Sequence, residues 1–135
     1  MTTGECLTVP ALLHRAAERA GSQAYVVTPD ERLSYADAET RSAAAARWLL
    51  GAGVGKGTRV GLFFPNGVEW VIWWLAASRV GAVVVPLSTM YRPAEIAKVL
   101  RLADVAVLVA PPRVLSIDVA ERLEAALPEL AGQPG

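Results

Sequence analysis

Residues 59–88 read RVGLFFPNGVEWVIWWLAASRVGAVVVPLS, and this stretch limits the possible folds more than any other part of the chain. Its first apolar run, 59–64, has few polar breaks, which is typical of a strand covered on both faces in a parallel sheet. A helix is predicted at 68–80 and a second buried strand at 82–87. Two parallel strands joined by a helix form one crossover unit, so we expect an α/β protein.

The helix predicted at 68–80 is apolar nearly all round and carries Trp70, Trp73 and Trp74. A helix of this kind needs partners on more than one face. The tryptophans can pack within this chain, dock against another domain or subunit, or form a wall of an apolar ligand tunnel. The sequence leaves these three interpretations open.

Capping and turn residues predict the remaining elements. Ser34 with Asp37, and Asn66 with Glu69, are expected to cap the starts of two helices. The other predicted elements are a helix at 9–20, a hairpin with strands at 24–28 and 33–35, a helix that ends near residue 52, a helix at 92–102, a strand at 105–110 and a helix at 114–127. This order predicts a three-layer, Rossmann-like, mostly parallel sheet with flanking helices.

Composition and charge exclude several classes of protein. The chain has 13 Lys and Arg against 13 Asp and Glu and no basic stripe, which argues against nucleic-acid binding. Its single cysteine, Cys6, cannot form an internal disulfide, so a reducing, cytoplasmic setting is expected. Residues 1–10 lack a basic start followed by an apolar run, so no signal peptide is predicted. Arg79 and Pro86 interrupt the long apolar run at 68–87, so no membrane span is expected.

The glycine-rich run GAGVGKG at 51–57 does not match a phosphate loop. A Walker-type loop needs glycine five residues before its Gly-Lys pair and Ser or Thr after it, but these positions hold Leu50 and Gly57. A dinucleotide fingerprint needs a strand before the glycines and a helix after them, and the predicted order here is reversed. The run is instead expected to end a helix, with Gly53 in a left-handed cap. The sequence therefore shows no phosphate-binding loop that would support the hypothesis of a small nucleotide-binding protein.

Four motifs occur in a fixed order along the chain. They are LSYAD at 33–37, GTRVGL at 57–62 followed by PNGVE at 65–69, AASRVGA at 76–82 through VPL at 85–87, and PAEI at 93–96. Together they resemble the N-terminal part of the adenylate-forming superfamily, which includes acyl-CoA synthetases, luciferases and the adenylation domains of peptide synthetases. The resemblance implies a partial N-terminal subdomain of an AMP-dependent synthetase/ligase at 9–127, with a flexible N-terminus at 1–8 and a frayed C-terminal end at 128–135.

Members of this superfamily convert a carboxylate and ATP into an acyl-adenylate, and then usually pass the acyl group to a thiol such as coenzyme A. Their chemistry needs a Ser/Thr/Gly-rich phosphate loop, magnesium and a lysine, which stabilise the charge that develops on the phosphates. The sequence of 135 residues contains neither that loop nor the lysine motif. The resemblance therefore implies the N-terminal part of a ligase most like a fatty-acid or aryl/acyl-CoA synthetase. The chain alone is expected to be a truncated, inactive piece that binds no cofactor, with ATP, Mg²⁺ and CoA used by the longer enzyme.

The loop after the strand at 82–87 is the candidate site, because ligands bind outside the carboxyl ends of strands in open α/β sheets. The resemblance places the passage for the acyl or pantetheine group near this loop. Ser88, Thr89, Met90 and Tyr91 are therefore candidate substrate- or CoA-lining residues, and an ordinary strand-to-helix loop is the alternative. No catalytic or metal-ligating residue is predicted.

A non-catalytic α/β interaction module derived from such an enzyme is the alternative function. A sheet without its other strands exposes an edge and an apolar face. The chain is therefore expected to self-associate through the sheet edge or the tryptophan-rich helix.

Overall fold

A parallel sheet of three strands lies at the centre of the protein in the computed structural model, which describes residues 7–132. The strands are β3 (Arg59–Leu62), β4 (Val83–Pro86) and β5 (Val107–Val109), in the spatial order β4-β3-β5. β3 pairs in parallel with both neighbours. The crossover predicted from the sequence is therefore present, with β3 as the central strand.

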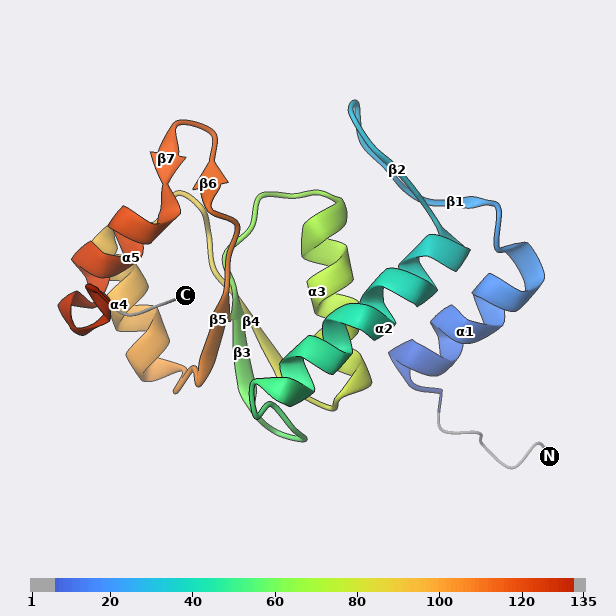
Figure 1. Ribbon diagram of the computed structural model, residues 1–135, viewed down its shortest axis with the longest axis horizontal. Helices are drawn as coiled ribbons and strands as arrows, with labels where there is room; N and C mark the ends of the chain where they lie inside the picture. Colours follow the sequence, from blue (N-terminus) through green and yellow to red (C-terminus); the bar gives the residue numbers. More distant parts are fainter. Residues whose placement is uncertain (1–6, 133–135) are drawn as a thin grey trace.

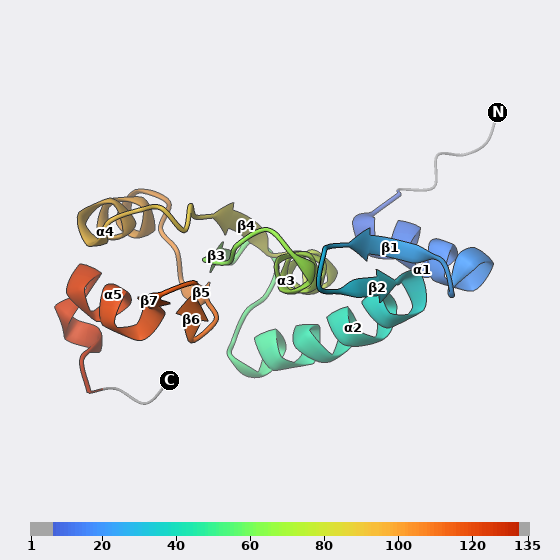
Figure 2. The ribbon, with the colours of Figure 1, turned by 90° about the horizontal axis from the view of Figure 1, so that it is seen from above.

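Helices cover both faces of this sheet and make an elongated, three-layer molecule (Figure 1). The helices of the described residues are α1 (Val9–Ala20), α2 (Tyr35–Gly51), α3 (Val68–Arg79), α4 (Pro93–Leu102) and α5 (Val119–Ala126), followed by a 3-10 turn, η1 (Pro128–Leu130). Figure 2 shows α2 and α3 on one side of the sheet and α4 and α5 on the other. The hairpin of β1 (Ala24–Val27) and β2 (Arg32–Ser34) lies with α1 beyond α2 and α3. The predicted α/β class is confirmed.

β3 divides its side chains between two apolar cores. Val60 and Leu62 are buried in the core on the α2–α3 side. Phe63, which follows the strand, is buried with residues of α4 and α5 in the second core. Gly61 has no side chain, and a Cβ at this position would lie 2.8 Å from Cδ1 of Leu108 on the second side. The alternation gives β3 two buried faces, as its apolar sequence predicts.

Local signals placed most helix ends correctly. Asp37 N donates to Oγ of Ser34 at 3.1 Å, so Ser34 caps α2 as predicted. Gly53 has φ of 84°, which confirms the left-handed residue after that helix. The predicted cap at Asn66 is wrong, because Gly67 is the N-cap of α3 and provides no side chain. Glu69 instead pairs with Arg41 of α2, so it is not available for a capping box.

The predicted helix at 114–127 is also wrong in its first turn. Two short strands, β6 (Arg113–Val114) and β7 (Ile117–Asp118), pair in antiparallel fashion there. Asp118 then caps α5, since its Oδ1 accepts from Glu121 N at 3.0 Å. The β-branched residues at 114 and 117 favour strand. The apolar residues of the segment also have a helical spacing, which led to the prediction of a helix in place of these two strands.

Leu115 at the tip of this hairpin predicts a stabilising substitution. Its φ is 54° and its side chain is 93% exposed, so it adopts a left-handed conformation with almost no burial. Leu115→Gly is expected to raise the free energy of unfolding by about 1 kcal/mol, because glycine carries no Cβ penalty in this region. A higher urea midpoint with an unchanged slope is the expected measurement. Ser116→Gly is the control and should give no gain, since Ser116 is not among the residues of positive φ; a lower midpoint for Leu115→Gly would contradict the prediction.

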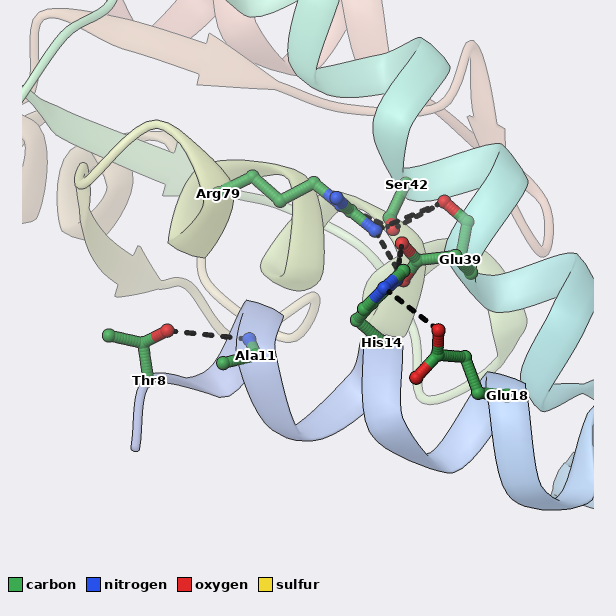
Figure 3. A network of polar contacts seen from close by, with 7 residues as sticks. All are labelled: Thr8, Ala11, His14, Glu18, Glu39, Ser42 and Arg79. Atoms are coloured by element: carbon green, nitrogen blue, oxygen red, sulfur yellow. Dashed lines mark hydrogen bonds and ion pairs between the residues drawn. The ribbon is translucent and has the colours of Figure 1, made fainter. Parts of the chain in front are cut away.

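A polar network joins the first three helices (Figure 3). Nη2 of Arg79 on α3 lies 2.6 Å from Oε2 of Glu39 on α2, and Nε of Arg79 donates to Oγ of the buried Ser42 at 2.9 Å. His14 on α1 places Nδ1 3.2 Å from Oε1 of Glu39 and Nε2 3.5 Å from Oε1 of Glu18. Glu39 therefore accepts contacts from both α1 and α3 and connects them to α2.

Tyr25 of β1 and Tyr35 of α2 stack with their ring centroids 4.9 Å apart. Burial raises the pKa of Tyr25, and the neighbouring Tyr35 raises it further. The folded chain therefore holds the Tyr25 proton more tightly than the unfolded chain does, and this contribution to stability is fully present below about pH 10.

This shift predicts an alkaline loss of stability. As the pH rises above about 10, the unfolded state loses the Tyr25 proton first and the free energy of unfolding falls. Tyr25→Phe is expected to make that fall shallower, because the variant has no phenolic proton to lose. Urea midpoints of both proteins at pH 8.5 and pH 10.5 measure the difference, and parallel declines would contradict the assignment.

Two further expectations concern the ends of the chain and the membrane. Residues 1–6, including Cys6, and 133–135 lie outside the described range, so the predicted flexible N-terminus at 1–8 and frayed end at 128–135 stay predictions. Within residues 7–132, every helix is too short or too polar to cross a bilayer.

Candidate functional site

An open depression of about 570 Å³ lies at the carboxyl ends of β3 and β4. The loop after β3 supplies residues 64–66, α3 supplies Trp70, and the end of β4 with the loop after it supplies the remaining wall. This is the edge of a parallel sheet at which ligands bind in open α/β folds.

The loop at 88–91 brings three of its four predicted residues to this depression. Ser88, Thr89 and Tyr91 line it. Met90 is 82% exposed and is not part of the lining. Tyr91 also packs against the core formed by α4 and α5.

Hydrogen bonds give this loop a defined shape. Tyr91 N donates to the carbonyl of Ser88 at 3.1 Å, which closes a turn, and Met90 N donates to Oγ of Ser88 at 3.2 Å. Nη1 of Arg122 on α5 lies 3.2 Å from the carbonyl oxygen of Tyr91 and 3.5 Å from that of Thr89. Arg122 was not predicted from the sequence, because it contacts backbone atoms about thirty residues away.

The lining of the depression is uncharged. Asn66, Ser88, Thr89 and Tyr91 supply neutral hydrogen-bonding groups, and the other lining residues are apolar or aromatic. Such a surface suits an acyl chain or an uncharged polar linker. It does not fit a triphosphate, which needs cations or a cradle of backbone N–H groups. Within residues 7–132, no group of three or more His, Cys, Asp and Glu side chains is placed to hold a metal ion.

The structure divides the tryptophans between different roles. Trp70 lines the depression, a contribution that only the tunnel interpretation of the cluster anticipated. Trp70, Trp73 and Trp74 are partly buried against the core on the α2–α3 side, which confirms packing within the chain. Trp48 is 57% exposed and meets Trp73 edge to face, with centroids 5.7 Å apart. Docking of another domain or subunit on the tryptophans of α3 stays a prediction.

Comparison with known protein families identifies the family to which this chain belongs. A family model described as "AMP-binding enzyme" matches residues 13–133, nearly the whole chain. The chain belongs to the AMP-binding enzyme family. The match confirms the resemblance to adenylate-forming enzymes that the four sequence motifs indicated.

Curated relatives of this chain are named as CoA ligases. A "3-[(3aS,4S,7aS)-7a-methyl-1,5-dioxo-octahydro-1H-inden-4-yl]propanoyl:CoA ligase" of Mycobacterium tuberculosis is 36% identical over 124 residues, which cover 91% of the chain and 24% of that relative. The human "Medium-chain acyl-CoA ligase ACSF2, mitochondrial" is 32% identical over 135 residues, which cover 99% of the chain and 21% of that relative. The chain therefore spans between a fifth and a quarter of the length of these relatives.

Solved structures of CoA ligases and related enzymes share the fold of this chain. The N-terminal domain of FACL13 from Mycobacterium tuberculosis superposes with a TM-score of 0.75 at 28% identity, over 84% of this chain and 29% of that chain. The anthranilate CoA ligase AuaEII, in complex with anthranoyl-AMP, superposes with a TM-score of 0.73 at 25% identity, over 77% of this chain and 20% of that chain. The chain thus has the architecture of the N-terminal subdomain of adenylate-forming enzymes.

Proposed function

We propose that this chain is the N-terminal part of an acyl-CoA ligase that activates a carboxylate with ATP and transfers the acyl group to CoA. The family match over residues 13–133, together with relatives named as acyl-CoA ligases, carries this proposal. ATP and Mg²⁺ are assigned to parts of the ligase other than the described residues, whose depression has no charged group to hold them. CoA or the acyl substrate is assigned to the depression itself.

Within that ligase, the loop at 88–91 is proposed to line the passage of the acyl or pantetheine group. Ser88 and Thr89 offer hydroxyls and Tyr91 offers an aromatic face, which suits a ligand with alternating polar and apolar parts. Met90, exposed and outside the lining, is proposed only as an outer contact. The chain supplies a wall and no reacting group in this scheme.

Pyrophosphate exchange tests the proposal. A polypeptide that continues past residue 135 should exchange pyrophosphate into ATP with at least one member of a carboxylate panel of medium-chain and aromatic acids. Residues 1–135 alone should show none. Thr89→Trp in the longer polypeptide should raise the KM for the carboxylate or CoA and leave that for ATP unchanged. A longer polypeptide inactive with every acid and with CoA would contradict the proposal.

An interaction module is the second candidate, and the sheet favours it. Among the described strands, β4 and β5 each pair on one side only. Val83 of β4 is 50% exposed and lies on the strand whose outer side is unpaired. Light scattering of residues 1–135 at micromolar concentration should show self-association, and a monodisperse monomer would count against it.

The cytoplasmic setting also stays a prediction, since the human relative is named as mitochondrial.

A further inference from the structure

We propose that Arg122 is a positioning residue for the loop at 88–91, an inference that rests on the proposed function of this loop. Arg122 lies on α5, and its half-buried side chain reaches the loop between β4 and α4. One nitrogen, Nη1, lies 3.2 Å from the carbonyl oxygen of Tyr91 and 3.5 Å from that of Thr89.

The chemistry of the guanidinium explains why one residue can hold two carbonyls. Nη1 carries two N–H groups, so it can donate one to Thr89 and one to Tyr91. Neither residue lies in a strand of the sheet. A hydrogen bond from a charged donor is about twice as strong as one between neutral groups. The guanidinium therefore connects a loop outside the sheet to α5 through charged hydrogen bonds.

The internal hydrogen bonds of the loop and the contacts of Arg122 have different effects. The bonds from Met90 N and Tyr91 N to Ser88 fix the shape of the turn. The bonds from Arg122 fix the position of that turn relative to α5. Since Trp70 of α3 lines the same depression as this turn, the position of the turn affects the shape of the depression.

α5 is a firm support for this role. Asp118 caps its first turn, and Val119 and Ala126 are buried in the same core as Phe63. Phe63 directly follows β3, the central strand, so the support extends from the middle of the sheet through α5 to the loop. Arg122 is thus anchored by packing on its own helix and does not depend on the loop for its place.

Hydrogen exchange on the 135-residue chain tests the contact directly. Arg122→Met keeps the apolar stem and removes the donors, and should speed exchange of the Met90 and Tyr91 amides about tenfold. Arg122→Lys keeps a charged donor and should give a smaller increase. Arg47→Met, at an exposed arginine of α2, is the matched control and should leave both amides unchanged. Unchanged exchange in Arg122→Met would overturn the proposal.

Kinetics of the longer ligase test the consequence for substrate. Arg122→Met should raise the KM for the carboxylate or for CoA about tenfold, with kcat and the KM for ATP little changed, and Arg122→Lys should recover part of the loss. Equal KM values in Arg122→Met and the unmodified ligase would overturn the positioning role. If the longer polypeptide shows no pyrophosphate exchange, the proposed function is contradicted. The hydrogen-exchange result would still decide whether Arg122 holds the loop.

Discussion

Gly61→Val is expected to lower the free energy of unfolding by about 3 kcal/mol, because the centre of the sheet has no room for a side chain. Gly61 pairs with Val85 on one side and Leu108 on the other. A Cβ at this position would lie 2.8 Å from Cδ1 of Leu108, 3.1 Å from Cγ1 of Val105 and 3.3 Å from Cδ1 of Leu87. Chemical unfolding followed by tryptophan fluorescence measures the loss.

A graded series separates crowding from backbone effects. Gly61→Ala adds only the Cβ and should cost about 1 kcal/mol, since the nearest atom is the end of a flexible leucine side chain that can move. Gly55→Ala and Gly55→Val are the controls, because a Cβ at Gly55 meets no atom within 4 Å. Equal effects at the two glycines would show that crowding is not the cause.

Arg79→Met is expected to cost about 3 kcal/mol, because it leaves the carboxylate of Glu39 without its arginine partner. The side chains of Arg79 and Glu39 are only 19% and 26% exposed, and Oε2 of Glu39 is buried. The substitution also removes the donor to Oγ of the buried Ser42. Urea unfolding at neutral pH should show the lower midpoint.

The chain contains a matched control for this pair. Arg41 and Glu69 also join α2 to α3, but their side chains are 43% and 50% exposed. Arg41→Met should therefore cost less than about 1 kcal/mol, as exposed ion pairs usually do. Adding Glu39→Gln to Arg79→Met should restore part of the loss, because it removes the unpaired charge. A double variant no more stable than Arg79→Met would contradict this explanation.

Sequence patterns predicted the elements whose signals are local. The apolar run before Pro65 identified the central strand, and Ser34 identified the start of α2. Asn66 was a misleading cap signal, because Gly67 takes the capping position and Glu69 pairs with another helix. The hairpin before α5 was missed for a similar reason: two strands of two residues each leave no period that a sequence pattern can reveal.

The site was predictable only in part. The topological rule placed Ser88, Thr89 and Tyr91 at a sheet edge where a depression exists. It could not distinguish them from Met90, because exposure within a four-residue turn depends on the direction of each side chain. Phe64 and Trp70, which also line the depression, and Arg122, which donates to the loop, come from distant segments that only the fold brings together.

The order of the strands also sets the order in which a growing chain can fold. β3 is the central strand, but both of its neighbours come later in the sequence. The core shared by α1, α2 and α3 draws only on residues up to 75, whereas the pairing of β3 with β5 joins residues as far apart as 60 and 107. Contacts close in sequence form faster than distant ones. During synthesis, the helical layer can therefore form before β4 and β5 have emerged to pair with the two edges of β3.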